Sequence, residues 1–564
     1  MPIMANRRQK KEGKAMTKSR LIAIFALFLL AFSVVIGRLF LLAQNTDYAQ
    51  TAKNQTITTL TLEQQRGNLY DTNGHCLTRA ENRYFALSIP GESSYAELFQ
   101  YVSYEEQATL YKKRNAISPF LVEVNGDLND LGVYTYTVPQ RYYGIPIAEH
   151  LIGYLDGDGQ GVSGLELAFN ELLGKNRGVR TIQCVTTAQG SLMQGEEPTL
   201  TDTSSGGSGV MLTLDESIQR ACEAIAQETM TKGCILVLET ATAKVRASVS
   251  MPEFDPNNIQ ASIQAQDTSL LNRVFCQYNV GSVFKPVLAA AALEQGLDWF
   301  SVECEGVLDL NGHQYRCAQQ KAHGLTNLTS GLEKSCNNMF IQLGLTLGAE
   351  TVHDIAEKFG FGQPIYLAGG LKSAAGNLPS AETLQNLGQL ASVSFGQGQL
   401  MATPVQLAGA MNVIAGDGQY RTPSFLEGIV DEASKQITES LYDPEVRRVI
   451  QADTAKTLRS MLTGVIQEGT GKDAAPMNGT AGGKTGTAQT AVYDEDGREE
   501  MNYWFTGFYP AETPLYTIVV LQDGTPEPQT SSAAIFSKVC DALFWLQDNA
   551  TQEKILQENS TEIS

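Results

Sequence analysis

The longest apolar run of the chain lies near its start, at Leu21–Ala43, where Ser33 and Arg38 are the only polar residues. That length suits a helix that spans a membrane, which needs about 20 apolar residues. A cleaved signal peptide would have a shorter apolar region of about 7–15 residues and an A-x-A-like site after it, and no convincing site follows here. We therefore expect an uncleaved membrane anchor at 21–43, and no second span, because no other stretch is as long and apolar.

The segment that follows the anchor changes pattern quickly. Residues 45–205 alternate between short apolar runs and turns, and Asn73-Gly74 between alternating residues is typical of a β-hairpin. This pattern predicts a mixed domain of short strands and helices. The Ser/Gly-rich run at 204–209 predicts a flexible joint at its end.

From residue 210 to 548 the pattern predicts an α+β domain. We expect a helix at 216–230, helical runs in the middle, and strands at 210–215, 234–240, 244–250, 483–492, 502–510 and 515–524. Turns at 494–497 and 511–514 would join the last three strands. Strands at both ends of a domain with helices between them indicate an antiparallel sheet closed by its terminal strands. The polar tail at 549–564 is expected to fray.

The distribution of charge predicts how the anchor is oriented in the membrane. The net charge is −20, yet residues 1–20 hold seven Lys/Arg and one acidic residue. Basic residues flank membrane helices on the cytoplasmic side, so we expect residues 1–20 in the cytoplasm and the acidic bulk outside the cell membrane. The acidic balance excludes nucleic acid as a natural partner, because phosphate binding needs basic surface.

The sequence offers no familiar metal motif. The five histidines include no pair at a ligand spacing such as HxxxH, and no CxxC occurs. We therefore expect no metal site and no cofactor. Of nine cysteines, Cys304 and Cys317 bracket a predicted hairpin turn at 309–312. They either pair across that hairpin or remain two buried thiols, and the sequence favours neither.

Candidate chemistry begins at Ser282 and Lys285, the only S-x-x-K in the chain. Pro286 is tolerated only in the first turn of a helix, so Ser282 should lie near a helix N-terminus, where unpaired N–H groups can stabilise an oxyanion. Residues three apart share a helix face, so Lys285 can reach the serine hydroxyl and act as its base if burial or a neighbouring cation lowers its pKa. The alternative is a capping serine followed by a solvated lysine.

Two further segments carry suitable side chains. Ser335 and Asn337 lie two residues apart and could pass a proton and hold a carbonyl, although Asn337 could equally cap the helix that follows. The only K-T-G lies on a predicted strand. There Lys484 would bring a second positive charge that lowers the pKa of Lys285 and attracts a substrate carboxylate. The alternative is a turn-rich strand edge.

The order S-x-x-K, S-x-N, K-T-G is the motif set of penicillin-binding proteins and serine β-lactamases. The flanking runs "GSVFKP", "SFGQGQLMATPVQLAGAMNVIAGDG" and "KTGTAQ" followed by "WFTGFYP" resemble the transpeptidase domain of class B penicillin-binding proteins. "RGNLYDTNG" and "GVSGLELAFNELLGKNRG" resemble that family's pedestal, or dimerisation, domain, although Thr72 stands where the family usually has a basic residue. The resemblance covers about residues 20–545.

The resemblance implies a pedestal at 45–205 and a transpeptidase domain at 210–548, with helices on both faces of its sheet and an all-helical subdomain. It implies that Ser282 attacks the D-Ala–D-Ala bond of a peptidoglycan stem peptide, with Lys285 as base. The remaining site residues would be Ser335, Asn337, Lys484, Thr485, Gly486 and Thr487. It also implies acylation by β-lactams, a place at the membrane, and a membrane-embedded glycosyltransferase as partner.

Other functions remain as alternatives. A D,D-carboxypeptidase would use water as acceptor, which the sequence does not exclude. A β-lactamase would need a deacylating carboxylate, and Glu382 with Asn386 has the E-x-x-x-N spacing, but the flanking runs match class B. A glycosyltransferase domain would need an E-D-x-x-F-x-x-H-x-G motif that 45–205 lacks. Intact Ser282, Lys285 and Lys484 argue against a non-catalytic sensor or scaffold.

Overall fold

A computed structural model describes residues 18–44, 57–78, 82–89, 95–142, 144–175, 178–187, 190–203, 206–265, 267–494, 496–525 and 527–561. Most of the predicted cytoplasmic segment at 1–20 lies outside these residues. The chain forms two compact units: unit 1 contains 1–63, 83–138 and 180–202, and unit 2 contains 64–82, 139–179 and 203–564. Residues 64–82 and 139–179, which belong to the predicted pedestal, thus group with the later residues. The two compact units are therefore not divided at the Ser/Gly-rich run 204–209 alone. The predicted domain boundaries stay a prediction.

Helix α1 spans Lys18–Ala43 and coincides with the predicted anchor. It is the one helix long and apolar enough to cross a membrane among the described residues. All of its described side chains are exposed, including Phe25, Leu27 and Phe28. An apolar helix with no protein packed around it is consistent with a single membrane anchor.

Unit 1 is built around two three-stranded sheets. One has the order β1 (Ile57–Gln64), β6 (Val179–Val185), β7 (Thr199–Asp202), and the other has the order β4 (Phe120–Val124), β3 (Asn82–Ser88), β5 (Thr135–Pro139). Buried Leu62, Leu87 and Ile182 join the two sheets in one apolar cluster. Helices α3 (Tyr95–Leu98) and α4 (Tyr104–Lys112) complete the unit.

Unit 2 begins with segments 64–82 and 139–179, which a buried ion pair ties together. Arg66 Nε and Arg141 Nε both donate to the carboxylate of fully buried Glu166, which lies in α6 (Gly164–Ala168). Strand β2 (Leu69–Tyr70) pairs in parallel with β8 (Ser208–Leu212). Their sheet has the order β19 (Ile437–Ser440), β18 (Leu426–Asp431), β8, β2. Thr72, which stands where the resembled family has a basic residue, accepts a hydrogen bond from Arg246 Nη1 at 3.1 Å, so a positive charge is supplied there by β10 (Val245–Met251).

The main sheet of unit 2 is antiparallel, with the order β10-β9-β23-β22-β21. Its strands are β9 (Gly233–Glu239), β10 (Val245–Met251), β21 (Gly482–Tyr493), β22 (Glu499–Tyr509) and β23 (Tyr516–Thr525). Within this sheet, the first strand along the chain, β9, pairs with the last, β23, through seven residue pairs. The predicted sheet closed by its terminal strands is confirmed, and it is an open sheet rather than a barrel.

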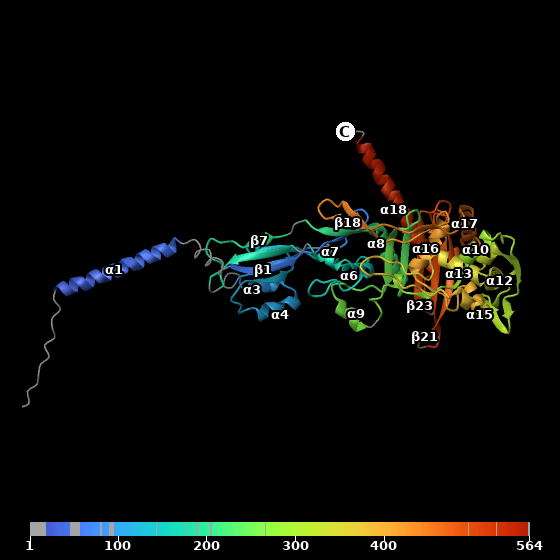
Figure 1. Cartoon of the computed structure of the whole chain (residues 1–564), viewed down its shortest axis with the longest axis horizontal. Helices are drawn as coiled ribbons and strands as arrows, with labels where there is room; N and C mark the ends of the chain where they lie inside the picture. Colours follow the sequence, from blue (N-terminus) through green and yellow to red (C-terminus); the bar gives the residue numbers. More distant parts are fainter. Residues whose placement is uncertain are drawn as a thin grey trace, which may run out of the picture. The chain divides into compact units, whose positions relative to one another are not determined.

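Alternate residues of β9 face opposite layers. Ile235 and Val237 belong to an apolar cluster with α8 (Glu216–Thr229) and α18 (Ser532–Thr561), and Leu236 and Leu238 belong to the cluster with α16 (Pro404–Ala415). Helices therefore cover both faces, as predicted (Figure 1). The predicted polar tail at 549–564 lies within α18 as far as Thr561.

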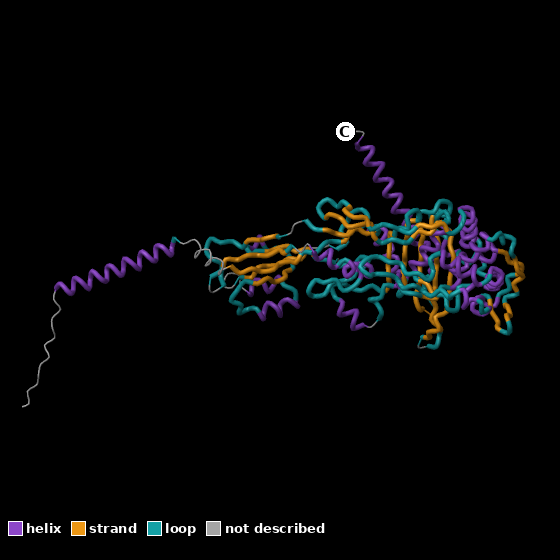
Figure 2. Tube along the Cα trace, in the orientation of Figure 1, coloured by secondary structure: helices purple, strands orange, loops and turns teal. Residues whose placement is uncertain are grey.

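Beyond α16, further helices gather on one side of the sheet (Figures 1 and 2). They are α10 (Lys285–Glu294), α11 (Leu328–Glu333), α12 (Asn337–Leu347), α13 (Ala349–Lys358), α14 (Ala381–Leu384), α15 (Leu387–Ser394) and α17 (Ala452–Gln467). Two short ribbons interrupt them: β12 (Ser301–Cys304) with β15 (Gly324–Asn327), and β13 (Val307–Leu310) with β14 (His313–Arg316). The turn between β13 and β14 is the predicted hairpin.

Candidate active site

Ser282 lies on the single-turn helix η4 (Gly281–Phe284), which continues directly into α10 with Pro286 in its first turn. The expected place near a helix N-terminus is therefore confirmed. Gly281 has φ +64°, and a Cβ on it would lie 2.7 Å from the carbonyl oxygen of Thr487. A glycine is thus required for η4 to approach β21 this closely. Ser282 is half-buried and opens into a cleft of about 1120 Å³.

The amine of Lys285 connects the first two predicted motifs. Lys285 is fully buried, and its Nζ donates to Ser335 O at 2.7 Å, to Ser335 Oγ at 3.2 Å and to Asn337 Oδ1 at 2.7 Å. These three hydrogen bonds hold the amine at Ser335 and Asn337, and none of them involves Ser282. The alternative of a solvated lysine is wrong.

Ser335 and Asn337 converge because of the backbone before α12. Ser335 has φ +52°, an uncommon conformation for a residue other than glycine. Asn337 does not cap the helix, since Cys336 is the N-cap and its Sγ accepts from Met339 N. The amide of Asn337 instead bridges Lys285 and the carbonyl oxygen of Arg316, to which Nδ2 donates at 2.8 Å.

Burial lowers the pKa of Lys285 to about 7, and negative charge on the thiols of Cys336 and Cys317 acts in the opposite direction. Burial is thus the dominant cause, and the charge of Lys484, which the sequence also predicted to lower this pKa, is not among the causes. An amine that is half-neutral near pH 7 can accept the proton of a nucleophile, which a solvated lysine cannot do efficiently.

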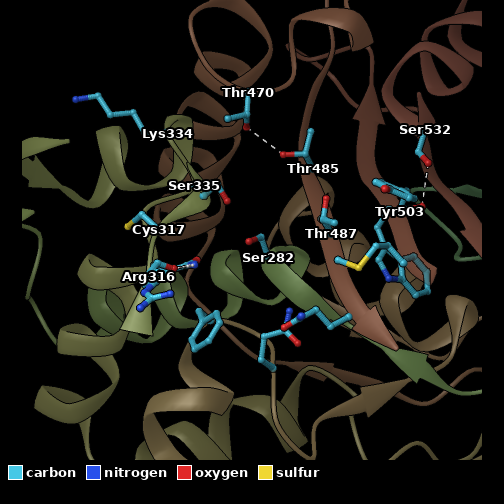
Figure 3. A pocket seen from close by; sticks show the side chains of 18 of the residues that line it. Ser282, Arg316, Cys317, Lys334, Ser335, Thr470, Thr485, Thr487, Tyr503 and Ser532 are labelled. Carbon is cyan, nitrogen blue, oxygen red and sulfur yellow. Dashed lines mark hydrogen bonds between the residues drawn. The ribbon is translucent and has the colours of Figure 1, made fainter. Parts of the chain in front are cut away.

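The third motif forms the opposite wall of the cleft, on β21. Lys484 is fully buried, and its Nζ donates to Thr485 O at 3.0 Å and Thr485 Oγ1 at 3.3 Å. Burial and, second, the positive charge of Lys285 hold the pKa of Lys484 well below its usual range. Thr485, Gly486 and Thr487 line the cleft, and Figure 3 shows Ser282 between Ser335 and these threonines.

Sequence reasoning missed several residues of the cleft. Thr470 Oγ1 lies 3.0 Å from Thr485 Oγ1, and this pair closes one end of the wall (Figure 3). Arg316, Tyr503 and Trp504 also line the cleft. Trp504 begins the run "WFTGFYP" that carried the family resemblance, but no role in the site was predicted for it. Thr470, Arg316 and Tyr503 belong to none of the motifs, so no local signal could have identified them before the sheet and the β13–β14 ribbon were placed.

Three cysteines cluster next to the segment that carries Ser335 and Asn337, because Cys336 lies between these two residues. Cys304 and Cys317 are both buried with their Sγ atoms 3.7 Å apart, so the structure has them as thiols rather than as a disulfide. Cys336 and His323 join them, and the four ligand atoms lie within 4.8 Å of one another. The expectation of no metal site rested on local spacings, which do not apply to residues gathered from separate elements.

The arrangement has the parts of an acyl-transfer site. It combines a hydroxyl at a helix N-terminus, a buried amine with a pKa near neutrality, and a strand edge with hydroxyl groups. Of the eight residues predicted for the site, Ser282, Ser335, Asn337, Thr485, Gly486 and Thr487 line the cleft, and the two lysines lie buried beneath it.

Comparison with known proteins agrees with this site. Residues 233–541, more than half of the chain, match the family described as the penicillin binding protein transpeptidase domain. The chain is 31% identical over 409 residues to Stage V sporulation protein D of Bacillus subtilis, covering 70% of this chain and 61% of that protein. It is 30% identical over 467 residues to penicillin-binding protein PbpB of Mycolicibacterium smegmatis, covering 77% of this chain and 67% of that protein.

Solved structures show the same fold. Penicillin-binding protein 3 of Mycobacterium tuberculosis, complexed with aztreonam, aligns with a TM-score of 0.63 at 24% identity, over 87% of this chain and 97% of that chain. A chain of a peptidoglycan synthase complex aligns with a TM-score of 0.67 at 22% identity, over 93% of this chain and 98% of that chain. Motif geometry, sequence and fold agree: the chain belongs to the penicillin-binding protein transpeptidase family.

Proposed function

We propose that the protein is a membrane-anchored peptidoglycan D,D-transpeptidase that works through an acyl-enzyme on Ser282. The proposal rests on the hydrogen bonds from buried Lys285 to Ser335 and Asn337, two residues that line the same cleft as Ser282 and Thr485. This arrangement supplies a nucleophile, a base and a proton relay at one point of an open cleft. Among the curated relatives, FtsI of Escherichia coli is named a peptidoglycan D,D-transpeptidase.

In the first half-reaction, Ser282 Oγ attacks the carbonyl carbon between the two terminal D-alanines of a stem peptide, and neutral Lys285 takes the hydroxyl proton. The backbone N–H groups of Ser282 and Thr487 stabilise the oxyanion, and one such donor is worth about two to three powers of ten in rate. The C–N bond then breaks, and the released D-alanine amine receives its proton through Ser335, which Lys285 contacts.

The terminal carboxylate of the substrate binds at the third motif. Lys484 is buried, so it acts through Thr485, whose hydroxyl it contacts and which opens into the cleft. Thr487 supplies a second, exposed hydroxyl. In the second half-reaction the amine of another stem peptide attacks the acyl-enzyme and forms the cross-link. If water is the acceptor, the same site is a D,D-carboxypeptidase.

The location and partners belong to the same proposal. The basic N-terminus lies in the cytoplasm, α1 crosses the membrane once, and the acidic domains meet peptidoglycan outside. A membrane-embedded glycosyltransferase that supplies new glycan strands is the expected partner, supported by the likeness to a chain of a peptidoglycan synthase complex. β-Lactams acylate Ser282 as mimics of the D-Ala–D-Ala terminus, supported by the aztreonam complex of the Mycobacterium tuberculosis protein.

The test uses full-length protein in detergent with uncross-linked glycan strands that carry pentapeptide stems. We expect cross-linked muropeptide dimers with the wild type and with Ser392→Ala, which alters another serine of the cleft, and none with Ser282→Ala. Dimers formed by folded Ser282→Ala would refute the mechanism. Release of D-alanine without dimers would identify the carboxypeptidase.

A further inference from the structure

The strongest unassigned feature of unit 2 is the group Cys304, Cys317, His323 and Cys336, here called the thiol cluster. Cys304 ends β12, Cys317 and His323 bracket the loop that precedes β15, and Cys336 caps α12. The three cysteines are 1%, 3% and 0% exposed, and the histidine is half-buried. Thiolates and imidazole are the ligands that Zn²⁺ prefers in closed structural sites.

The distances in the thiol cluster fit a tetrahedral ion. With Zn–S bonds of about 2.3 Å and a Zn–N bond of about 2.0–2.1 Å, a tetrahedron has S···S edges of about 3.8 Å and S···N edges of about 3.6 Å. The Sγ atoms of Cys304 and Cys317 lie 3.7 Å apart, and those of Cys317 and Cys336 lie 3.8 Å apart. His323 Nδ1 lies 3.5 Å from Cys304 Sγ.

A disulfide explains the same cluster less well. A bonded pair has its sulfurs about 2.05 Å apart, and three cysteines would leave one thiol unpaired. Cys317 instead stands nearly equidistant from both of its neighbours. Similar distances between the three sulfur atoms, with an imidazole nitrogen beside them, are typical of a metal site rather than of a disulfide.

We propose that Cys304, Cys317, His323 and Cys336 bind one Zn²⁺ ion, and that this ion fixes the position of Ser335 and Asn337 in the active site. The first part stands on the thiol cluster alone, whereas the second part rests on the proposed function.

The second part follows from how the ligands connect to the site. Cys336 lies between Ser335 and Asn337, which accept all three hydrogen bonds of Lys285. Cys317 follows Arg316, whose carbonyl oxygen accepts from Asn337 Nδ2. An ion that joins Cys317 to Cys336 would therefore hold Asn337 and its partner Arg316 at a fixed distance from each other.

The loop between Cys317 and His323 has a strained backbone that a bound ion would hold in place. Gln319 and Gln320 both have positive φ, 54° and 55°, which is uncommon for two consecutive residues other than glycine. A Cβ on Gly306 would lie 2.3 Å from the carbonyl oxygen of Gln320, so the loop packs closely on the turn after Cys304. Binding of Cys304, Cys317 and His323 to one ion would hold this conformation.

The first test measures metal in full-length protein that was expressed with zinc and purified without chelators. We expect about one Zn²⁺ per chain, and Co²⁺ in its place should give the thiolate charge-transfer and ligand-field bands of a tetrahedral site. Cys304→Ala and Cys317→Ala should lose the ion. Cys222→Ala should keep it, because it truncates an equally buried cysteine in α8.

The wild type decides the outcome even if a variant fails to fold. The proposal is overturned if folded wild-type protein contains iron or no metal. It is also overturned if peptides of the wild type show a disulfide between Cys304 and Cys317. A folded Cys304→Ala/Cys317→Ala double variant that retains stoichiometric zinc overturns it as well.

The second test separates positioning from metal binding. Removal of zinc should slow acylation of Ser282 by fluorescent penicillin about tenfold to a hundredfold, since a misplacement of about 1 Å can cost that much. Added Zn²⁺ should restore the rate in the wild type and in Cys222→Ala. Unchanged acylation after complete removal overturns the positioning role. Zinc-replete wild type that does not react with penicillin at all would instead contradict the proposed function, and the measured zinc content would stand.

Discussion

At the scale of single residues, the chemistry of the site depends on the burial of one amine. Lys285 is fully buried, and burial lowers its pKa to about 7 because the charged form loses its hydration. Ser335 and Asn337 accept hydrogen bonds from this amine and hold it in place. The same side chain in water would stay protonated at neutral pH and could not serve as a base.

This burial predicts the pH dependence of acylation. The neutral amine is the reactive form, so the second-order rate of penicillin acylation should rise with pH through about 7 and level off above it. Lys285→Arg keeps its positive charge at every working pH, so it should lose this rise and react about 10²–10⁴-fold more slowly. Stopped-flow acylation between pH 5 and 9 measures both effects. A rate that falls as pH rises would show that the protonated form is required.

A second residue separates a transpeptidase from a β-lactamase. Glu382 is exposed in the first turn of α14, whose N-cap Ser380 accepts from Thr383 N, and it does not line the cleft. The Asn386 side chain caps α15. Both residues therefore have structural roles at helix starts.

We therefore expect the penicillin adduct of Ser282 to persist for many minutes, and Glu382→Gln to leave its decay unchanged. Intact-mass spectrometry over time measures the decay of both proteins. Rapid turnover by the wild type, lost in Glu382→Gln with accumulation of the adduct, would place the protein among the β-lactamases.

At the scale of elements, the contact between η4 and β21 aligns the nucleophile with the substrate-binding strand. Gly281 and Gly486 allow the two backbones to approach. The indole Nε1 of Trp504, on β22, donates to Asn279 O at 3.0 Å and ties the sheet to the residues just before Ser282. These contacts fix the position of Ser282 relative to β21 and β22.

Gly486→Ala tests this contact. The new Cβ would lie 2.9 Å from Val283 Cγ1 and 3.1 Å from Trp504 Cβ, so it should push η4 away from β21. We expect penicillin acylation to fall by about a hundredfold, with a loss of stability of about 1–3 kcal/mol. Gly157→Ala, whose Cβ would meet nothing within 4 Å, should change neither the acylation rate nor the thermal midpoint. Equal acylation rates for the two variants would mean that this contact does not align the site.

Elements also show what the sequence could and could not predict. The main-sheet strands and α8 follow from local alternation and turn residues, and Pro286 alone placed Ser282 at a helix start. Motif order brought Ser282, Asn337 and Lys484 together across long separations. The thiol cluster could not be predicted, because its ligands are spaced by 12, 5 and 12 intervening residues and meet only through tertiary structure. The packing of 64–82 and 139–179 with the later residues of unit 2 depends on contacts such as Asn68 N with Glu432 Oε1 and Ala148 N with Glu223 Oε1, which no local pattern links.

At the scale of the whole molecule, α1 is separable from the chemistry. No described residue of α1 is buried, whereas the whole site lies in unit 2. We expect a chain that starts at residue 45 to leave the membrane fraction and to react with penicillin at the wild-type rate. Sedimentation of membranes and acylation kinetics check these two outcomes. A truncated chain that stays with the membrane would reveal a second membrane contact.

The chemistry of the whole molecule begins with acylation of Ser282, which can be measured in the anchored protein itself. Intact membranes that contain the full-length protein are labelled with fluorescent penicillin, and the modified peptide is mapped by mass spectrometry. We expect one adduct per chain, on Ser282, and none on a folded Ser282→Ala variant. An adduct on any other serine, or folded wild-type protein that penicillin does not modify, would contradict the proposed acylation of Ser282.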